Sequence, residues 1–327
     1  MKLASRRKGR DGELLVVARD LASSASAMHI APTLQTALEE WDRLAPALEE
    51  LYTRVNEGRA PGQSALDVAA LDAPLPRAWQ WLDGSAYAQH GELMATAFSR
   101  PKIQSAFPLM YQGLSHQFLA PRDQVLFPSE EDGIDFEGEF AVLTGAVPLG
   151  ASPQVAANSI RLVMQVNDWS LRKLAAQEVK TGFGWLLSKP ACSAAPIALT
   201  PDELGSAWQH CRLNATLEIW RGEQVFGRVP ADGMSCGFDE LIVHAARTRA
   251  LCAGTIVGSG TVSSSRYQEV GSCCISERQA IEMISQGAAQ TGYLRYGERI
   301  RMSAFAAGFS VPLFGVMDSV VAAPAPA

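Results

Sequence analysis

The start of the chain combines strand-like and helical hydrophobic spacing. The stretch from Glu13 to Arg19, which is apolar from Leu14 to Ala18, predicts a strand, and Ser23 to Ile30 predicts a weaker second one. After Pro32 and Thr33, apolar positions recur at helical spacing, which predicts one amphipathic helix. These positions are Leu34, Ala37, Leu38, Trp41, Leu44, Leu48, Leu51 and Val55. Glycine and proline residues from Gly58 to Gly62 end the helix, so residues 1–70 are expected to form a small α/β domain.

The remainder of the chain is expected to be mostly β. The small-residue, proline-rich stretch from Gln63 to Pro76 is interpreted as a linker. Beyond it, short strands separated by Gly and Pro turns continue to Phe314. The strands expected are 212–220, 224–229, 255–262, 299–304 and 309–313, and the two clearest helices are 153–159 and 238–249. Residues 71–320 therefore predict a rolled, mostly antiparallel α+β domain, followed by a disordered Ala/Pro-rich tail at 321–327.

Composition narrows the classes of protein. The chain has 327 residues, of which 47% are hydrophobic and 19% charged, and its net charge is −6. These values are typical of a globular protein, and the acidic balance argues against nucleic-acid binding. No apolar run is long enough to span a bilayer, and the apolar piece Leu14 to Ala18 is too short for a signal peptide. We therefore expect a cytoplasmic protein with no membrane partner.

The cysteines do not indicate a zinc or dithiol site. Six are present and none is spaced as C-x-x-C. Buried free thiols in a reducing compartment are the simplest interpretation.

Three acids at alternate positions carry the strongest chemical signal. Asp135, Glu137 and Glu139 fall in a stretch from Asp135 to Leu143 that reads as one strand, so they should share a face. Carboxylates lined up in this way either face water or hold a cation. Without thiolate or clustered imidazole partners, they suit Mg²⁺, Mn²⁺ or Ca²⁺. From the strand alone, a solvated outer face of an edge strand remains the simpler interpretation.

Three later segments add candidate chemistry. Asp168 follows the apolar run from Ile160 to Val166 and could project into a site, although acids there are often cap or turn residues. Lys189 follows apolar residues and could stabilise an anion, although such lysines usually reach the surface. The small-residue turn from Gly258 to Ser263 could cradle a carboxylate or simply form a tight bend.

Taken in order, these segments resemble the fumarylacetoacetate hydrolase family. The resemblance rests on Asp-Phe-Glu-Gly-Glu at 135–139, Asn-Asp-Trp-Ser-Leu-Arg at 167–172, Lys189 and Gly-Ser-Gly-Thr-Val-Ser at 258–263, and it extends from about Trp81 to Phe314. It implies a mixed β-roll and a divalent cation held by carboxylates, Mg²⁺ first, with Mn²⁺ or Ca²⁺ as alternatives. It also implies a homodimer.

The resemblance assigns roles to individual residues. It implies metal ligands at Glu137, Glu139 and Asp168, with Asp83 as a fourth, whereas Asp135 matches a position that is not normally a ligand. It implies a general base at His90, oriented by Glu92 or Glu277, and an anion-stabilising lysine at Lys189. Substrate contacts are expected from Thr261, Tyr111, Gln112 and Arg172, and His116 falls in a segment that faces substrate in the family.

The chain also departs from the family pattern. Substrate-binding glutamine and tyrosine positions correspond to Ala175 and Val179, and the acid that orients the histidine falls near Ile275. Glu92 follows His90 by two residues rather than the three seen in smaller relatives. These differences leave the substrate open but do not affect the expected metal site.

The expected activity is metal-dependent hydrolysis of a C–C bond in a 2,4-diketo acid of the fumarylacetoacetate or acylpyruvate type. The same acids could instead support an isomerase or decarboxylase acting on a 2-oxo or 2-hydroxy-diene dioate. A non-catalytic metal-binding module is a further alternative, because a fold does not determine activity.

Overall fold

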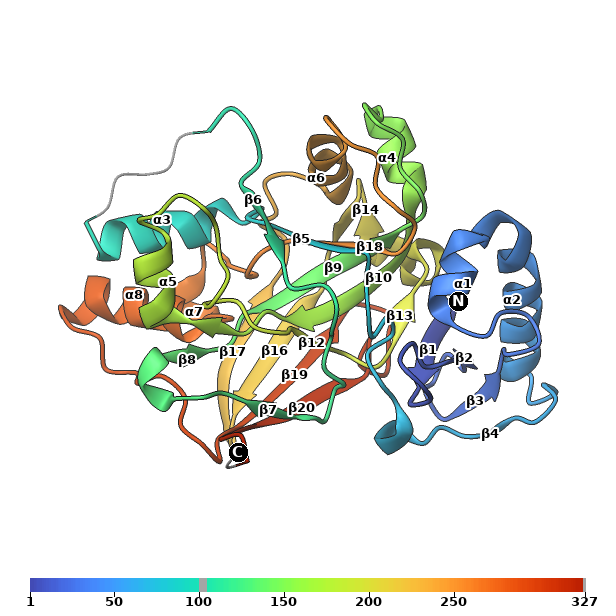
Figure 1. Ribbon diagram of the computed structural model, residues 1–327. Coiled ribbons are helices and arrows are strands. Elements are labelled where there is room, and N and C mark those ends of the chain that lie inside the picture. The colour runs from blue at the N-terminus through green and yellow to red at the C-terminus, as the bar shows by residue number, and fades with distance from the viewer. Residues whose placement is uncertain (100–104, 326–327) are drawn as a thin grey trace.

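Two β-sheets form the body of the protein in the computed structural model, which describes residues 1–99 and 105–325 (Figure 1). The larger sheet has eleven strands in the order β4-β3-β2-β1-β13-β10-β9-β18-β5-β6, and β12 pairs with β10 off this path. Their bounds are β1 (Lys2–Arg6), β2 (Glu13–Val17), β3 (Ser23–Ser26), β4 (Ser64–Ala65), β5 (Gln80–Gly84), β6 (Met110–Gly113), β9 (Gly138–Thr144), β10 (Ile160–Asn167), β12 (Ser193–Ala194), β13 (Ala198–Leu199) and β18 (Thr255–Gly258).

The second sheet has five strands in the order β17-β16-β19-β20-β7. They are β7 (Gln124–Leu126), β16 (Thr216–Arg221), β17 (Gln224–Pro230), β19 (Arg299–Phe305) and β20 (Val316–Ala322). Most pairs are antiparallel, but β18 pairs with β5 and β20 with β7 in parallel. The expected mixed, mostly β architecture with a separate N-terminal region is thus confirmed.

The central strand β9 is buried on both faces, because each face packs in a different core. Phe140 and Val142 lie in the core shared with the second sheet, among residues such as Leu217. Ala141 and Leu143 face the other core, which contains N-terminal residues such as Leu48. This double burial explains why the apolar run of β9 shows no alternation with polar residues.

Helices cover the ends and faces of the sheets. They are α1 (Leu34–Glu39), α2 (Trp41–Asn56), α3 (Ala88–Ala97), α4 (Pro153–Ser159), α5 (Arg172–Glu178), α6 (Phe238–Ala245), α7 (Tyr267–Val270) and α8 (Ile275–Gln286). Short 3₁₀ helices are η1 (Val68–Ala70), η2 (Glu130–Asp132) and η3 (Pro201–Ala207). Two-stranded ribbons pair β8 (Ile134–Asp135) with β11 (Ser170–Leu171), and β14 (Trp208–Gln209) with β15 (Arg212–Leu213). None of the helices in the described residues is long and apolar enough to cross a membrane.

Several predicted elements need correction. The single N-terminal helix is two helices, because the backbone leaves helical geometry at Glu40. The predicted strand 309–313 is irregular chain, and α6 ends at Ala245 rather than at residue 249. By contrast, α4 has its predicted bounds, and the Ser152 side chain caps it by accepting from Val155 N.

The disordered tail was also predicted to begin too early. β20 continues to Ala322 and lies between β19 and β7 in the sheet, and the Val321 side chain is fully buried in the core. Ala/Pro-rich composition therefore did not prevent pairing where an apolar side chain reached the core. The prediction for residues 326 and 327 lies outside the described residues.

Candidate active site

Three buried carboxylates from three segments meet at one point. Asp83 comes from β5, Glu139 from β9 and Asp168 follows β10. Each offers an oxygen, and these oxygens all lie within 4.8 Å of one another. The register of the large sheet produces this meeting, because Glu139 pairs with Val166 while Asp83 pairs with Gly258 on the strand that also borders β9.

The Gly258–Ser263 turn leaves room for one of these acids. A Cβ on Gly258 would lie 2.3 Å from Asp83 Oδ1, so a side chain there would collide with the carboxylate. Gly260, whose φ of +75° favours glycine, donates its backbone N–H to the same oxygen over 3.2 Å. The turn thus cradles a carboxylate, and that carboxylate belongs to the protein.

Glu139 is the least compensated acid of the group. Its side chain is fully buried, and neither carboxylate oxygen has a hydrogen-bond partner among the described residues. Burial and the neighbouring Asp83 and Asp168 carboxylates raise the pKa of Glu139 well above its usual value. An unpartnered buried carboxylate is costly, and three hard oxygen donors are what Mg²⁺, Mn²⁺ and Ca²⁺ accept. The residues present therefore fit a divalent cation.

Glu137 lies in a different environment. Its oxygens accept from Arg172 Nη2 at 2.5 Å and from Lys189 Nζ at 2.6 Å. Burial alone would raise the pKa of Glu137, but Arg172 and Lys189 hold it below its usual range. Glu137 lies outside the group of three acids described above, so its predicted role as a metal ligand stays a prediction.

The expected row of three acids on one strand face is wrong. The stretch is split, because β8 ends at Asp135 and β9 begins only at Gly138. Asp135 accepts from the backbone N–H groups of Ile275 and Ser276, at 2.7 and 2.9 Å, and from Arg172 Nε at 2.8 Å. It therefore caps the N-terminus of α8 and is not part of the acid cluster.

Asp168 is the most contacted of the clustered acids. Lys189 Nζ and the Tyr111 hydroxyl donate to its Oδ2, the hydroxyl over 2.6 Å, and Cys192 Sγ lies 3.1 Å from its Oδ1. Burial alone would lower the pKa of Lys189, but Asp168 and Glu137 raise it, so the ammonium stays charged. Sequence reasoning treated Cys192 only as a buried thiol, and its spacing carried no signal of this contact.

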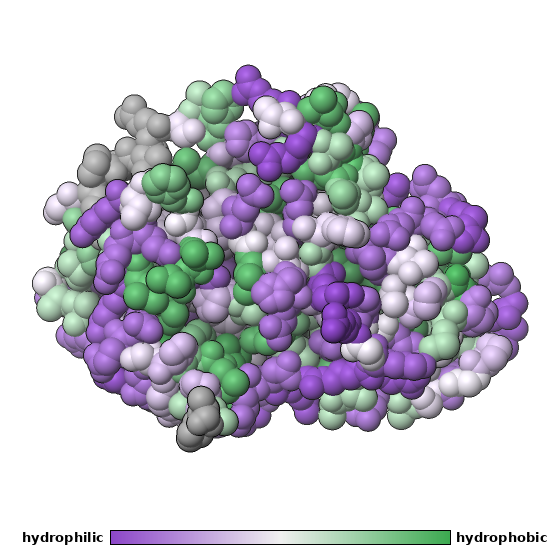
Figure 2. Space-filling view, viewed as in Figure 1, coloured by the Kyte–Doolittle hydropathy of each residue, from purple (hydrophilic) through white to green (hydrophobic). Residues whose placement is uncertain are grey.

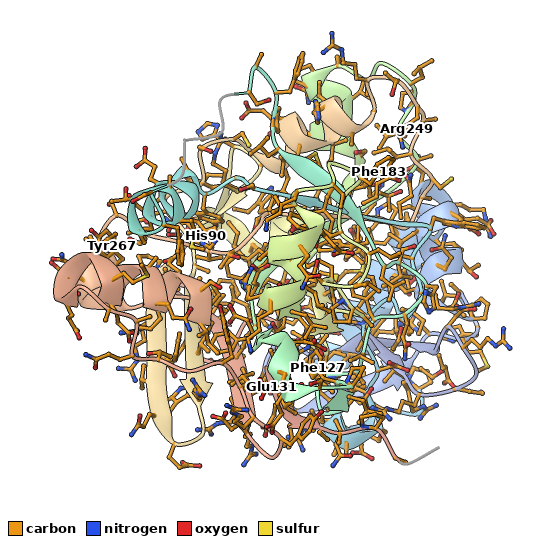
Figure 3. All side chains as sticks on the ribbon, turned by 60° about the vertical axis from the view of Figure 1, so that its left-hand side comes forward. His90, Phe127, Glu131, Phe183, Arg249 and Tyr267 are labelled. Carbon is orange, nitrogen blue, oxygen red and sulfur yellow. The ribbon has the colours of Figure 1, made fainter. Side chains whose placement is uncertain are left out.

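His90 is paired with a carboxylate from another helix. Its Nδ1 lies 2.7 Å from Glu277 Oε2, and Glu277, which is fully buried, also accepts from Ser263 Oγ at 3.1 Å. A carboxylate at Nδ1 favours the tautomer with the proton on Nδ1 and leaves Nε2 able to accept a proton. Glu92 is exposed on α3, so of the two predicted partners the structure brings Glu277, and not Glu92, to the histidine. Figure 3 shows His90 where α3 and α8 meet.

Many of these groups line one cavity of about 360 Å³, although Asp168 and Glu277 are not among its lining residues. Its lining residues are Asp83, Gly84, Ser85, His90, Leu109, Met110, Tyr111, Glu137, Glu139, Arg172, Ala175, Trp185, Lys189, Gly260 and Thr261. Val179, which corresponds to a substrate position of the family, is 52% exposed and not among them.

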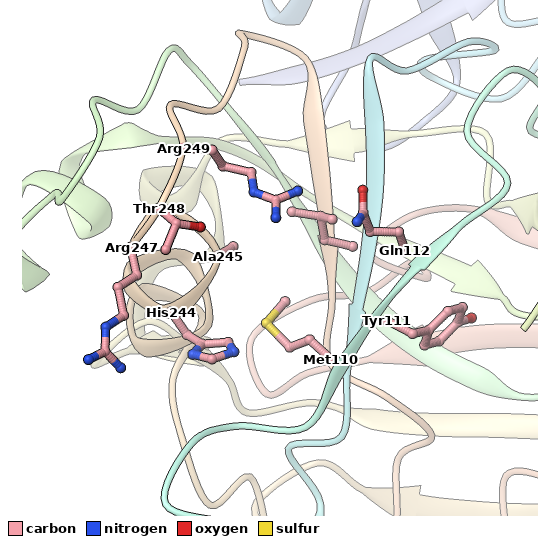
Figure 4. Close-up of a pocket in the computed structure, with 9 residues that line it drawn as sticks. Met110, Tyr111, Gln112, His244, Ala245, Arg247, Thr248 and Arg249 are labelled. Carbon is pink, nitrogen blue, oxygen red and sulfur yellow. The ribbon is translucent and has the colours of Figure 1, made fainter. Parts of the chain in front are cut away.

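Gln112 and His116 lie elsewhere. Gln112 lines a neighbouring cavity of about 290 Å³, whose lining comes largely from β6 and from the end of α6, including His244. In Figure 4 the ring of Tyr111 points away from His244, whereas Met110 points toward it, as expected for alternate positions of a strand. His116 is exposed in a third cavity beside Trp79. The structure therefore does not bring either residue to the acid cluster.

Fold and site together define a mixed β-roll protein with a buried carboxylate cluster beside a histidine–glutamate pair. Residues 80–321 match the family described as fumarylacetoacetate (FAA) hydrolase C-terminal, and residues 1–77 match fumarylacetoacetase N-terminal domain 2. The chain belongs to the fumarylacetoacetate hydrolase family, as the sequence motifs predicted.

Solved structures of similar fold carry different activities. One is maleylpyruvate hydrolase from Sphingobium sp. SYK-6 with manganese(II) and pyruvate, at 16% identity, a TM-score of 0.67, and coverage of 99% of this chain and 100% of that one. A probable 2-hydroxyhepta-2,4-diene-1,7-dioate isomerase from Mycobacterium abscessus has 19% identity, a TM-score of 0.67 and full coverage of both chains. A fumarylacetoacetate hydrolase from Exiguobacterium antarcticum has 16% identity and a TM-score of 0.68, covering 99% and 100% of the two chains.

No curated protein matches the sequence. At the identities of the solved structures, the likeness establishes the fold and leaves the activity to be argued from the site.

Proposed function

We propose that this protein is a metal-dependent hydrolase that cleaves a C–C bond in a 2,4-diketo acid of the fumarylacetoacetate or acylpyruvate type. The observation that carries the proposal is the cavity lined by Asp83, Glu139 and His90, because two members of the buried acid cluster there lie beside a carboxylate-oriented histidine. A metal-binding module without catalysis would have no use for the His90–Glu277 pair, so that alternative is disfavoured.

The proposed cofactor is Mg²⁺, with Mn²⁺ or Ca²⁺ as substitutes. Asp83, Glu139 and Asp168 would hold it, and Glu137 is proposed as a further ligand beside them. A divalent cation bound there acts as a Lewis acid that polarises a carbonyl group of the substrate. The manganese(II) in the Sphingobium structure supports a divalent ion in this fold.

The protein's own groups supply proton transfer and charge. His90 Nε2 takes a proton from water, Glu277 stabilises the resulting imidazolium, and the hydroxide formed attacks the distal carbonyl. Lys189 stabilises the enolate that leaves as the C–C bond breaks, and the proton held on His90 passes to the enolate carbon, which frees the base. Thr261 contacts the substrate carboxylate. Arg172 was predicted to bind substrate, but its guanidinium pairs with Asp135 and Glu137, which supports a role in positioning Glu137.

An isomerase or decarboxylase is the second candidate, because the same fold occurs in the Mycobacterium abscessus protein. Product analysis separates the reactions. Metal-loaded protein is incubated with acylpyruvates, fumarylacetoacetate and a 2-hydroxy-diene dioate, and the products are identified by mass spectrometry. We expect two acids from a diketo acid, with one oxygen taken from ¹⁸O-labelled water. An isomer of unchanged mass, or release of CO₂, would replace the hydrolase proposal with the corresponding alternative.

We also propose that the protein is a homodimer, on the basis of family membership. Light scattering after size-exclusion chromatography measures the mass directly. A mass of one chain at working concentration would contradict this assembly.

A further inference from the structure

The loop that follows α5 is fastened at its end by one carboxylate. Glu178 accepts hydrogen bonds from the backbone N–H groups of Leu186, Leu187 and Ser188, at 3.1, 2.8 and 3.0 Å, and also from the Ser188 hydroxyl. The loop from Val179 to Leu187 therefore returns to the helix from which it leaves. The fastened end of the loop, at Ser188, immediately precedes Lys189, whose ammonium contacts Asp168 in the acid cluster.

The loop turns apolar side chains toward the cavity mouth and toward solvent. Trp185 lines the cavity, whereas Phe183 is 98% exposed and Leu186 is 80% exposed. Gly182 and Gly184 both have positive φ, +74° and +102°, which allows the tight tip that presents Phe183. Figure 2 shows hydrophobic surface in the region of α5, and Figure 3 shows Phe183 beyond the end of that helix. Exposed apolar residues grouped beside a cavity are typical of a ligand-binding rim.

The cavity is polar at its floor and apolar at its rim. At the floor, Asp83, Glu139 and Thr261 are each at most 6% exposed, whereas Leu109 at the rim is 41% exposed. Ala175 and Trp185 are half-buried and complete this apolar side.

The Arg and Lys side chains that line the cavity already form ion pairs with carboxylates of the protein. Among the described lining residues, Arg172 is paired with Asp135 and Glu137, and Lys189 is paired with Glu137 and Asp168. A second carboxylate at the distal end of a substrate would meet Leu109 and Trp185 there. It would lose hydration, and no described lining residue offers it an uncommitted Lys or Arg side chain.

We propose that Trp185 and the rim residues Leu109 and Ala175 bind an apolar distal acyl group. The preferred substrate is then a monocarboxylate, an acylpyruvate with an alkyl or aryl group. This inference rests on the hydrolase proposed above and adds the substrate class. It differs from the dioate and maleylpyruvate named for the proteins of similar fold.

A substrate series tests the proposal. Acylpyruvates with distal methyl, propyl and pentyl groups are compared with one whose distal chain ends in a carboxylate. We expect kcat/KM to rise about fourfold for each buried methylene, the ratio that corresponds to about 0.8 kcal/mol, until the cavity is filled. The carboxylate-terminated substrate should be at least about tenfold poorer than the alkyl substrate of equal length.

Two variants on the same loop locate the effect. Trp185→Ala should flatten the pentyl-to-methyl ratio of kcat/KM, mainly through KM, because it removes the apolar wall. Leu187→Ala is the matched control, since Leu187 is 62% exposed and does not line the cavity. Calorimetric binding of hexanoate, a product-like acid, gives a readout independent of turnover and should weaken only in Trp185→Ala.

The outcomes separate this inference from the proposed function. A preference for the carboxylate-terminated substrate, or an unchanged ratio in Trp185→Ala, would overturn the apolar rim while leaving the hydrolase intact. If the loop variants changed only the oligomeric mass, the exposed residues would belong to a contact between copies, and the inference would be wrong. Absence of hydrolysis with every substrate, together with normal hexanoate binding, would instead overturn the proposed function.

Discussion

Replacing Glu277 by glutamine tests whether this buried acid orients the base. The substitution keeps the side-chain size but removes the charge that accepts the proton on His90 Nδ1 over 2.7 Å. The glutamine can also donate to Nδ1, which would stabilise the wrong tautomer. One buried hydrogen bond to a charged group is worth about 1.5–3 kcal/mol. We therefore expect kcat to fall roughly 10- to 150-fold, at about 1.4 kcal/mol for each factor of ten.

The assay is the steady-state loss of ultraviolet absorbance of an acylpyruvate at saturating metal. His90→Ala should lower kcat by about 10²–10⁴, the typical contribution of a general base. The variant that combines His90→Ala with Glu277→Gln should be no slower than His90→Ala alone, because Glu277 acts through the histidine. Glu92→Gln, on the exposed side of the same helix, is the comparison. If Glu277→Gln kept full activity, or if Glu92→Gln were the damaging change, the assignment of the orienting acid would be refuted.

Three further predictions concern charge at and around the site. Glu139→Gln should stabilise the metal-free protein by about 1–3 kcal/mol, because a buried carboxyl with a raised pKa costs folding free energy at neutral pH and a neutral amide does not; a chelator-treated thermal melt measures this. Asp135→Ala should lower the free energy of unfolding in urea by about 3–5 kcal/mol, since it uncaps α8 and leaves the half-buried Arg172 with one partner; a loss below 1 kcal/mol would contradict this. Burial alone would raise the pKa of Glu178, but hydrogen bonds from the Ser188 hydroxyl and from backbone N–H groups lower it below its usual value. The fastening of the loop should therefore persist above the ordinary glutamate pKa and be lost as pH falls through the lowered value. Amide hydrogen exchange at residues 186–188, measured in the wild type and in Glu178→Gln, tests this. Equal protection of these amides in both proteins would contradict the prediction.

Sequence reasoning succeeded where motif and local physics agreed. The bounds of α4 followed from Ser152 and Pro153, and the motifs placed Glu139, Asp168 and Lys189 in one site.

The errors arose where tertiary contacts decide. The predicted acid strand failed because Asp135 is taken by the N-terminus of α8, which lies 140 residues further along the chain. The partner of His90 could not be chosen from spacing, because Glu277 comes from a helix 187 residues away. Gln112 was assigned to the site with Tyr111, although consecutive strand residues point to opposite faces.

The most direct test of the account follows metal binding and turnover together. Metal-stripped wild type and Glu139→Gln are titrated with Mn²⁺, and bound ion is measured by electron paramagnetic resonance while acylpyruvate decay is recorded on the same samples. We predict one ion per chain in the wild type, with rate rising in proportion to occupancy, and loss of both binding and rate in Glu139→Gln. A rate that does not depend on occupancy, or undiminished binding and turnover in the variant, would contradict a metal-dependent hydrolase built on these buried carboxylates.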